Sequence, residues 1–418
     1  MNNTLPRPAG RPIPAVGAGL PRVFTDTTGI VAHQQRFGPL PAVDGRLIDV
    51  IARSGLRGRG GAGFPTARKL AAVAAGRGPR VVVANGTESE PLSAKDKNLI
   101  ARSPHLVLDG LTLAGDALGA LRRIVCVERS HPVVEQALRG ACDERADQRI
   151  EIVLTPRRYS AGQETALVDL IDRGIGKPTL RRPFERGVDG RPTLVDNVET
   201  LAQIALIARY GPQWYAHLGT DDEPGSALVT VTGNVGSSAV YEIPCGYPLG
   251  DLLRSAGAPN PRAVLLGGYF GRWLPGEVAM AAQLSRASLA PLGADIGCGV
   301  IVALDADTCA VDELSRVAGW FAANSAGQCG ACTWGLRDLA QATQAVDAGG
   351  AGRSTVADIG RWSSMVKGRG ACRLPDGAAS FLESGLAVFA DEIEEHRVGR
   401  CHRQRNRLLP TPSPEAWA

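Results

Sequence analysis

A glycine-rich, basic segment between Ser54 and Lys69 constrains this chain more than any other part of its sequence. Glycine has no Cβ atom, so its backbone can approach a ligand closely and can adopt a positive φ where a turn requires it. Successive backbone N–H groups in such a loop can point at one anion, and the basic side chains of the segment add positive charge. The segment predicts a cradle for a phosphate-bearing ligand. A flexible basic loop is the alternative, but Phe64 and Pro65 directly after the glycines favour a fixed turn.

The spacing Gly58-x-Gly60-x-x-Gly63 matches the dinucleotide-binding fingerprint in letter but not in context. That fingerprint follows a strand, whereas the residues from Leu47 to Leu56 have the apolar spacing of a helix. We therefore predict a nucleotide cradle of another kind, which the chain enters from a helix.

Composition and charge narrow the class of protein. The net charge is only +4, and no long Lys/Arg run interleaved with aromatic residues supports binding to nucleic acid. Neither a secretory signal nor a run of about eighteen apolar residues is visible, so we expect a cytoplasmic protein with no membrane span. The nine cysteines include a Cys-x-x-Cys pair at Cys329 and Cys332. An odd count with such a pair favours a reducing compartment and metal or redox chemistry over a disulfide framework.

The composition and the pattern of apolar residues change three times along the chain. Residues 1–25, rich in Pro, Gly and Ala, are expected to form an extended arm. Residues 26–224 alternate strand-like and helical stretches and predict an α/β domain that binds the phosphate-bearing ligand. Residues 225–305 consist of short strand-like pieces with Gly/Pro turns and predict a smaller, separate α+β domain. Residues 306–418 predict a helical bundle that contains the Cys-x-x-Cys pair.

Alternation of strands and helices predicts a parallel sheet with right-handed crossovers in the α/β domain. Ligands of such sheets bind beyond the carboxyl ends of the strands, where residues 85–91, Asn-Gly-Thr-Glu-Ser-Glu-Pro, follow the first strand. The predicted strands are 80–85, 123–127 and 150–154, the helices between them are 106–121 and 133–141, and the helices of the bundle are 311–324, 336–348 and 378–396.

These motifs, in this order, resemble the flavin- and NADH-binding subunit family of respiratory complex I, which also occurs in NAD-linked hydrogenases and formate dehydrogenases. The resemblance covers about residues 40–396. It rests on the glycine loop, on 85–91 with Lys95-Asp96 behind it, on 162–167, on 190–201, on the β-rich insert and on the distant cysteines. It implies a Rossmann-like FMN domain with a parallel sheet, a β-grasp domain of the soluble-ligand-binding kind, and a C-terminal helical bundle that carries an iron–sulfur cluster.

The resemblance implies an FMN site made of backbone donors, a cation and polar side chains. Backbone N–H groups and a cation suit the phosphate, while Asn, Asp and Thr suit the ribityl hydroxyls and the amide edge of the flavin. Residues 196–200 also have the pattern of an N-cap followed by a first-turn acid, and one residue can both cap and bind. The expected FMN-binding residues are Gly58, Arg59, Gly60, Gly61, Gly63, Lys69, Asn85, Glu88, Ser89, Tyr159, Asp196, Asn197 and Thr200.

The same resemblance implies that NAD(H) lies over the flavin, between aromatic side chains and acidic hydrogen-bond partners. Ala72 stands where the family usually has a further Phe, and Gln163 and Thr87 replace a Glu and an Asp. One missing aromatic contact would weaken nucleotide binding by about tenfold. It also leaves open NADPH or reduced ferredoxin as the donor. The expected NAD-binding residues are Phe64, Glu90, Glu164, Arg181 and Phe184, with Arg181 in place of a customary Lys.

The cluster site departs from the family pattern of Cys-x-x-Cys-x-x-Cys followed by a distant fourth cysteine. Ala326 occupies the first position, which leaves Cys329, Cys332 and Cys372 as the expected metal ligands. Three thiolates fit a 3Fe-4S cluster, or a 4Fe-4S cluster whose fourth iron takes water, a carboxylate or another residue. Spacing does not select a substitute among Cys298, Cys309 and Cys401, and loss of the cluster with burial of the thiols is the alternative.

The combined expectation is an FMN-dependent NAD(P)H oxidoreductase module, an NADH dehydrogenase-like flavoprotein. The cofactor carries the chemistry, so no catalytic side chain is expected, and His105 and His396, near helix ends, are expected to be structural. A hydride would pass to FMN, and electrons would leave through the cluster to a small iron–sulfur protein, a ferredoxin-like or thioredoxin-like 2Fe-2S subunit. The alternatives are a non-enzymatic relay or scaffold subunit of a redox complex and a flavoprotein reduced by ferredoxin.

Overall fold

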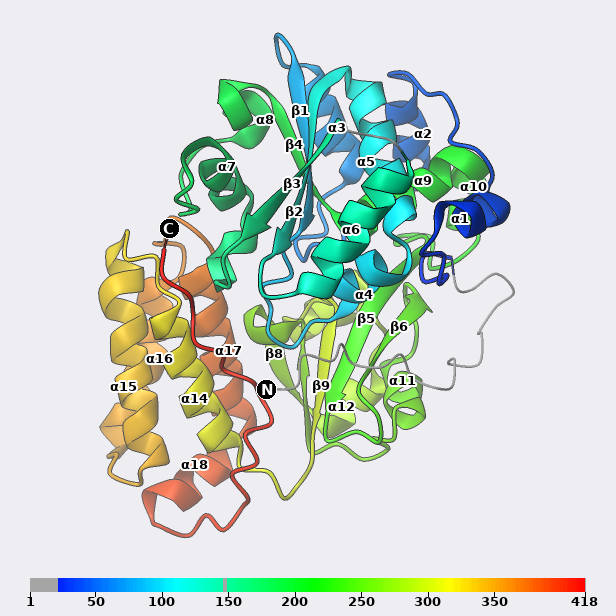
Figure 1. Cartoon of the computed structure of the whole chain (residues 1–418). Coiled ribbons are helices and arrows are strands. Elements are labelled where there is room, and N and C mark those ends of the chain that lie inside the picture. Colours follow the sequence, from blue (N-terminus) through cyan, green and yellow to red (C-terminus); the bar gives the residue numbers. More distant parts are fainter. Residues whose placement is uncertain (1–21, 146–148, 418) are drawn as a thin grey trace.

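The computed structural model describes residues 22–145 and 149–417, and Figure 1 shows their arrangement. Most of the predicted N-terminal arm, up to residue 21, lies outside the described residues. Val23, at the start of the described part, is buried in the core of the first domain.

A four-stranded, fully parallel sheet with the order β3-β2-β1-β4 forms the first domain. Apolar residues alternate between its two faces: Val82 and Ala84 face α5, α6 and α9, whereas Val81 and Val83 face α7. Both faces are therefore buried, as is usual for parallel sheets. The strands are β1 (Arg80–Gly86), β2 (Ala120–Glu128), β3 (Ile150–Thr155) and β4 (Thr193–Asn197), and the helices are α1 (Ile30–Phe37), α2 (Leu47–Ser54), α3 (Thr66–Ala74), α4 (Lys95–Arg102), α5 (Pro104–Leu118), α6 (Pro132–Glu144), α7 (Glu164–Arg173), α8 (Pro183–Arg186), α9 (Val198–Tyr210) and α10 (Pro212–Ala216).

A second sheet has the order β6-β5-β9-β7-β8 and mixes parallel and antiparallel pairs. Side chains on one face, such as Val229 and Ile301, pack beneath α11 and α12, while Leu265 and Val302 on the other face pack against the C-terminal helices. The elements are β5 (Ser226–Gly233), β6 (Ala239–Pro244), β7 (Ala263–Leu266), β8 (Arg272–Pro275), β9 (Val300–Leu304), α11 (Leu249–Ser255), α12 (Gly276–Ala281) and the short α13 (Arg286–Leu289).

The C-terminal part is a helical bundle that packs against β8 and β9 and is followed by an extended tail (Figure 1). The helices are α14 (Ala310–Ala323), α15 (Leu336–Asp347), α16 (Arg353–Val366), α17 (Leu374–Val388) and α18 (Ala390–Arg397). These findings confirm the predicted α/β class, with a parallel sheet, a second sheet of mixed strand directions and C-terminal helices.

Two details of the bundle differ from the sequence-based prediction. Helix α16 is absent from that prediction, because few apolar side chains on it are buried, Ile359 and Val366 among them. The single helix predicted over 378–396 is two helices that meet at Phe389. The Phe389 ring packs edge-on against Trp273 at a centroid distance of 5.1 Å, a contact with β8 that the local sequence does not encode.

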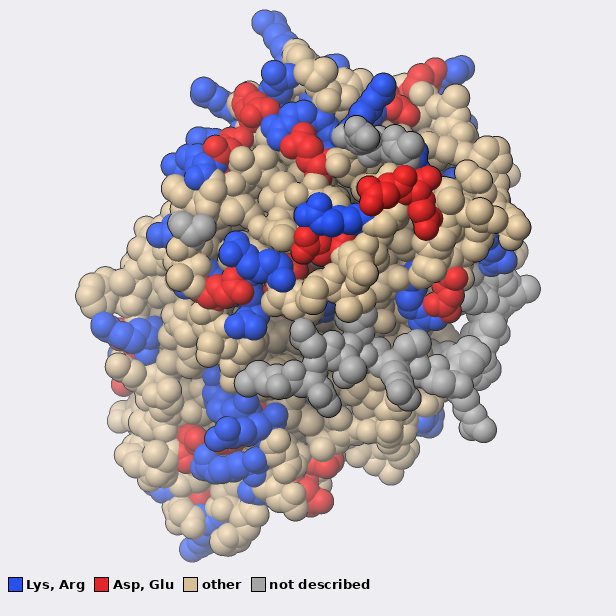
Figure 2. Space-filling view, viewed as in Figure 1, with Lys and Arg blue, Asp and Glu red and all other residues tan. Residues whose placement is uncertain are grey.

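Two further features concern the charges on the surface and the length of the helices. Figure 2 shows Lys and Arg side chains interspersed with Asp and Glu over one face of the molecule. Within the described residues, no helix combines the length and the apolar character needed to cross a lipid bilayer.

Candidate functional site

A cavity of about 590 Å³ lies where the parallel strands β1 and β4 end. Asn85 near the end of β1 is paired in register with Asn197, the last residue of β4. The glycine loop lies on one side, and Phe270 and Cys298 of the second domain, with Cys372 of the bundle, complete the wall. The cavity is thus at the position that open α/β sheets use for ligands.

Two backbone hydrogen bonds join the two ends of the glycine loop and hold it in a closed conformation. Gly58 N–H donates to the Phe64 carbonyl at 2.9 Å, and Thr66 N–H donates to the Leu56 carbonyl at 3.0 Å. Gly61 has a φ of 117°, which L side chains rarely adopt. A Cβ atom added at Gly60 would lie 3.3 Å from the Cβ atom of Asn197, tighter than an ordinary van der Waals contact. The loop leaves α2 and enters α3, so the predicted helix before the glycines is confirmed.

Two residues that the sequence placed in the FMN site hold the loop from behind. The Arg59 N–H donates to Thr200 Oγ1 at 2.9 Å, and Thr200 lies beneath the loop in α9. The buried Arg59 guanidinium donates to Tyr215 Oη at 3.0 Å and to Cys245 Sγ at 3.4 Å. The Arg59 guanidinium is therefore hydrogen-bonded to α10 and to the segment after β6. Thr200 positions the backbone of Arg59.

A buried network of charges forms the floor of the cavity. Lys95 Nζ donates to Asp96 Oδ1 at 2.7 Å and to Glu199 Oε2 at 2.9 Å. Burial lowers the pKa of Lys95, but Asp96 and Glu199 outweigh it and raise that pKa overall, so the ammonium remains charged. Asn197 Nδ2 donates to Asp96 Oδ2 at 2.7 Å, and Asn197 Oδ1 caps α9 by accepting from Glu199 N–H. The sequence showed the Lys95-Asp96 pair but not this role, which depends on a contact with α9.

Glu88 serves α4 as well as lining the cavity. Its two carboxylate oxygens accept from the N–H groups of Asp96 and Lys97, both at 3.0 Å, and the Ser93 hydroxyl also donates to it. Burial raises the pKa of Glu88, but Lys97 and these hydrogen bonds lower it overall. An acid at a helix N-terminus is stabilised by the free N–H groups there.

The opposite wall carries polar groups that are less fully engaged. Lys69 Nζ donates to the Val195 carbonyl and lies 3.8 Å from Glu164 Oε1. Asp196 is buried, burial raises its pKa, and its Oδ2 atom has no hydrogen-bond partner among the described residues. A buried oxygen of this kind fits a ligand with hydroxyl or N–H donors, which FMN offers along its ribityl chain and flavin edge. The residues present therefore fit the group that the sequence predicted.

The predicted FMN residues meet in this cavity more completely than the predicted NAD residues do. Phe64, 49% exposed, lies at the cavity, as do Glu90 and Glu164. Arg181 instead pairs with Asp172 at 3.4 Å, and Phe184 packs against the core of the first domain. The NAD roles of Arg181 and Phe184 stay predictions. Of the predicted FMN residues, those that line the cavity are Gly58, Arg59, Gly60, Gly61, Gly63, Lys69, Asn85, Glu88, Ser89, Tyr159, Asp196 and Asn197.

The three predicted cluster cysteines are neighbours at one end of the bundle. Cys329 and Cys332 lie on the turn that opens α15, and Cys372 comes just before α17. Burial raises the pKa of the Cys372 thiol, and Cys332 and Cys329 raise it further. Ala326 is buried at the position of the missing cysteine. A set of three adjacent thiols fits an iron–sulfur cluster, and Cys372 also lines the FMN cavity.

None of the three substitute cysteines considered from the sequence is shown to complete this set. Cys298 lies in the cavity wall, where its thiol donates to the Gly267 carbonyl at 3.3 Å. Cys309 caps the N-terminus of α14, whereas Ala326 follows the C-terminus of that helix. A helix of 14 residues is about 21 Å long, too far for a shared cluster. Cys401 lies beside Cys309.

The Glu90→Gln variant tests the acid in the cavity wall. Glu90 Oε2 accepts from Tyr159 Oη at 3.1 Å and from Tyr269 N–H at 2.9 Å, and burial raises the pKa of Glu90 from 4.5 to about 7. Between these two values the folded state binds more protons than the unfolded state, so the contribution of Glu90 to the free energy of unfolding falls as the pH rises. The change is at most about 3 kcal/mol.

Urea unfolding of the FMN-free protein at several pH values in this window measures the effect. The stability of Glu90→Gln relative to the wild type should rise steadily with pH, while Glu185→Gln, at an exposed carboxylate, should show no such trend. A constant difference between Glu90→Gln and the wild type would contradict the protonation of Glu90.

Comparisons with known proteins agree with this geometry. Residues 51–206 match the Nuo51 FMN-binding domain, and residues 312–396 match the NADH-ubiquinone oxidoreductase-F iron-sulfur binding region. The F subunit of the NADH-quinone oxidoreductase of Streptomyces coelicolor is 31% identical over 379 residues, which cover 85% of this chain and 83% of the relative. The F 2 subunit of the same enzyme in Rhizobium meliloti is 30% identical, with coverage of 84% and 89%.

A solved structure, the NAD+-reducing NiFe hydrogenase in the air-oxidised state, superposes with a TM-score of 0.77 at 30% identity. The match covers 88% of this chain but 64% of the hydrogenase chain, so this chain spans less than two thirds of that relative's length. From the cavity, the thiols and these matches, we conclude that the chain belongs to the family of NADH-quinone oxidoreductase F subunits and is an NADH dehydrogenase-like flavoprotein, with an FMN-binding domain and an iron–sulfur binding region.

Proposed function

We propose that this chain is the NADH-oxidising module of a multi-subunit complex, with FMN in the cavity at the ends of β1 and β4 and a small iron–sulfur protein as its acceptor. The observation that carries the proposal is a single cavity bounded both by the glycine loop and by Cys372. FMN, when bound, accepts a hydride from NADH and releases the electrons one at a time. The side chains and backbone groups of this chain would bind and orient it.

The loop and Lys69 would hold the phosphate of FMN, and the strand ends would hold its polar body. Backbone N–H groups of Gly60, Gly61 and Gly63 can converge on an anion without side-chain crowding. Asp196, with one unpartnered oxygen among the described residues, would accept from a ribityl hydroxyl or a flavin N–H. The floor around Lys95 is already hydrogen-bonded, so it supports these groups without rearrangement.

For the nucleotide, Phe64 is the residue best placed to contribute stacking. Its ring is half exposed at the cavity and has the Arg68 guanidinium 5.5 Å from its centroid. An aromatic stack adds roughly 0.5 to 1.5 kcal/mol beyond area burial. Glu90 and Glu164 would provide acceptors for ribose hydroxyls. The Gln163 side chain caps α7 by accepting from backbone N–H groups, so it is less suited to that role.

The cluster would be held by Cys329, Cys332 and Cys372, and the acceptor would dock on the adjoining surface. Ser325 Oγ donates to Cys332 Sγ at 3.0 Å, a hydrogen bond that would stabilise a thiolate ligand. Trp334, two residues beyond Cys332, is 57% exposed and carries the Arg337 guanidinium 4.6 Å from its ring centroid. An exposed Trp beside an Arg is typical of a protein contact site. This surface supports a partner protein close to the cluster.

The test is the spectrum of the anaerobically purified protein before and after reductant. We expect flavin bands with a broad iron–sulfur shoulder, and we expect NADH to bleach the flavin bands faster than NADPH or a reduced ferredoxin does. If only reduced ferredoxin bleached the flavin, the electrons would flow from ferredoxin to the flavin, and the proposed direction would be wrong. A colourless protein that binds neither cofactor on reconstitution would favour the scaffold role instead.

A further inference from the structure

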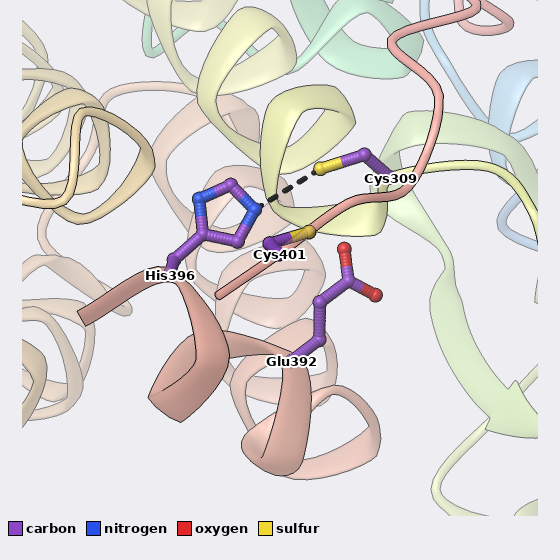
Figure 3. A group of neighbouring side chains, drawn as sticks. All are labelled: Cys309, Glu392, His396 and Cys401. Atoms are coloured by element: carbon purple, nitrogen blue, oxygen red, sulfur yellow. Dashed lines mark hydrogen bonds between the residues drawn. The ribbon is translucent and has the colours of Figure 1, made fainter. Parts of the chain in front are cut away.

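A second group of potential metal ligands lies at the other end of the bundle from the cluster cysteines. Its members are Cys309, Glu392, His396 and Cys401, and one ligand atom of each lies within 4.8 Å of those of all the others (Figure 3). Three segments supply them: Cys309 directly precedes α14, Glu392 and His396 are one turn apart on α18, and Cys401 begins the C-terminal tail. Cys309, Glu392 and His396 are 1%, 2% and 6% exposed.

The His396 ring is oriented as a metal ligand would be. Its Nδ1 atom lies 3.0 Å from the Asp347 carbonyl oxygen, which can only accept, so Nδ1 carries the proton. In the neutral ring Nε2 is then the atom with the free lone pair, and it faces Cys309 Sγ at 3.2 Å (Figure 3). A backbone carbonyl that fixes the tautomer in this way is the usual partner of metal-binding histidines.

Charges around the group suit two thiolates and a divalent cation. Glu392 Oε1 accepts from Ala310 N–H at 2.7 Å and from Val311 N–H at 3.2 Å, and Glu392 Oε2 accepts from Arg262 Nη1 at 2.6 Å. Arg403 Nε lies 3.7 Å from the same oxygen, so two guanidinium groups balance the carboxylate. Two thiolates would balance a 2+ ion, and the N-terminus of α14 favours negative charge at Cys309, which caps it.

We propose that Cys309, His396 and Cys401 bind one Zn²⁺ ion, with Glu392 at the fourth position. Zn²⁺ favours closed tetrahedral sites of sulfur and nitrogen, with oxygen as an accepted ligand. With bonds of about 2.3 Å to sulfur and 2.0 Å to nitrogen, the edges of such a tetrahedron are about 3.5 to 3.8 Å. The four ligand atoms already lie within 4.8 Å of one another, so a bound ion would draw them closer. Binding releases the two thiol protons to water, and no electron is transferred.

The ion would link Cys401, at the start of the C-terminal tail, to α14 and α18. Next to the site, Cys309 N–H donates to the Gln404 carbonyl at 2.8 Å. The tail then runs along α14 and ends beside η1 (Tyr159–Gly162), where Glu415 N–H donates to the Arg157 carbonyl at 3.1 Å. Tyr159, two residues further on, lines the FMN cavity. A zinc ion would therefore stabilise a segment that supports the cavity wall from outside, a structural role separate from NADH oxidation.

Metal analysis of the whole protein, purified without chelators and with its FMN and cluster present, tests this proposal. We expect about one zinc ion per chain, and zinc K-edge absorption showing two sulfur ligands with lighter ligands completing four. Cys309→Ser and Cys401→Ser should lower the zinc content to background, while Cys142→Ser, at a cysteine on α6, should leave it unchanged. Cys401→His, which keeps a zinc ligand, should retain the metal.

The zinc K-edge spectrum of the wild-type protein tests the site even if the serine variants do not fold. A zinc-free wild type, zinc retained by both serine variants, or a Cys309–Cys401 disulfide detected by mass spectrometry would each overturn the site. Bleaching of the flavin by NADH is measured on the same sample, so failure of the zinc site and failure of the proposed function are distinguishable.

Discussion

Replacing Gly60 with valine is expected to abolish FMN retention while leaving the circular dichroism spectrum nearly native. An added Cβ atom already lies 3.3 Å from Asn197 Cβ, and the branched methyl groups of valine extend further toward the floor or into the cavity. The loop must then move away from β4, which separates its backbone N–H groups from the groups at the strand ends. We expect at least about a hundredfold weaker FMN binding, about 2.7 kcal/mol.

The ratio of FMN to protein after gel filtration, with flavin fluorescence of the denatured sample, measures the loss. Gly140→Val is the matched control, because a Cβ atom there meets nothing within 4 Å and the residue lies on α6. Full FMN occupancy in Gly60→Val would refute the cradle.

Replacing Cys332 with alanine is expected to remove the cluster and to leave the flavin in place. Cys332 is buried and accepts a hydrogen bond from Ser325, and two remaining cysteines are too few to hold a cluster. Iron content should fall to background, and the EPR signal of the cluster should disappear. Bleaching of the flavin by NADH should continue, because the residues at the FMN cavity are unchanged.

Ala326→Cys is the complementary variant, because it restores the thiol that the family pattern has at this position. Its EPR signal should shift toward that of a cubane with four thiolates. Iron retained by Cys332→Ala, or a signal unaltered by Ala326→Cys, would contradict the assignment of three cysteine ligands with Ala326 in place of the first cysteine of the family pattern.

Features that depend on local sequence could be predicted, and those that depend on distant contacts could not. The apolar runs of β1 to β3 and the glycine loop are encoded within short segments, so the parallel sheet and the position of the cavity followed from them. The hydrogen bonds of the Arg59 guanidinium to Tyr215 and Cys245 cannot be predicted locally, because these partners lie more than 150 residues away in the sequence and Cys245 belongs to the second domain.

The group around His396 shows the same limit. Its cysteines are not distinctive by spacing, since Cys309 and Cys401 lie at opposite ends of the last part of the chain. Only the packing of α18 against α14 brings them together. A histidine near a helix end is therefore predicted to be structural on sequence alone. The proposed zinc site gives His396 a structural role of this kind, as a ligand that links α18 to α14 and the C-terminal tail.

The floor beneath the cavity has a consequence for how the protein binds its cofactor. Lys95, Asp96, Asn197 and Glu199 are linked to one another by hydrogen bonds that need no ligand. These side chains therefore lose their conformational entropy during folding, not at the moment of encounter. Association should accordingly proceed as docking into a preformed receptor, with little concentration-dependent lag and with nearly identical hydrogen-exchange protection of these strand ends before and after loading.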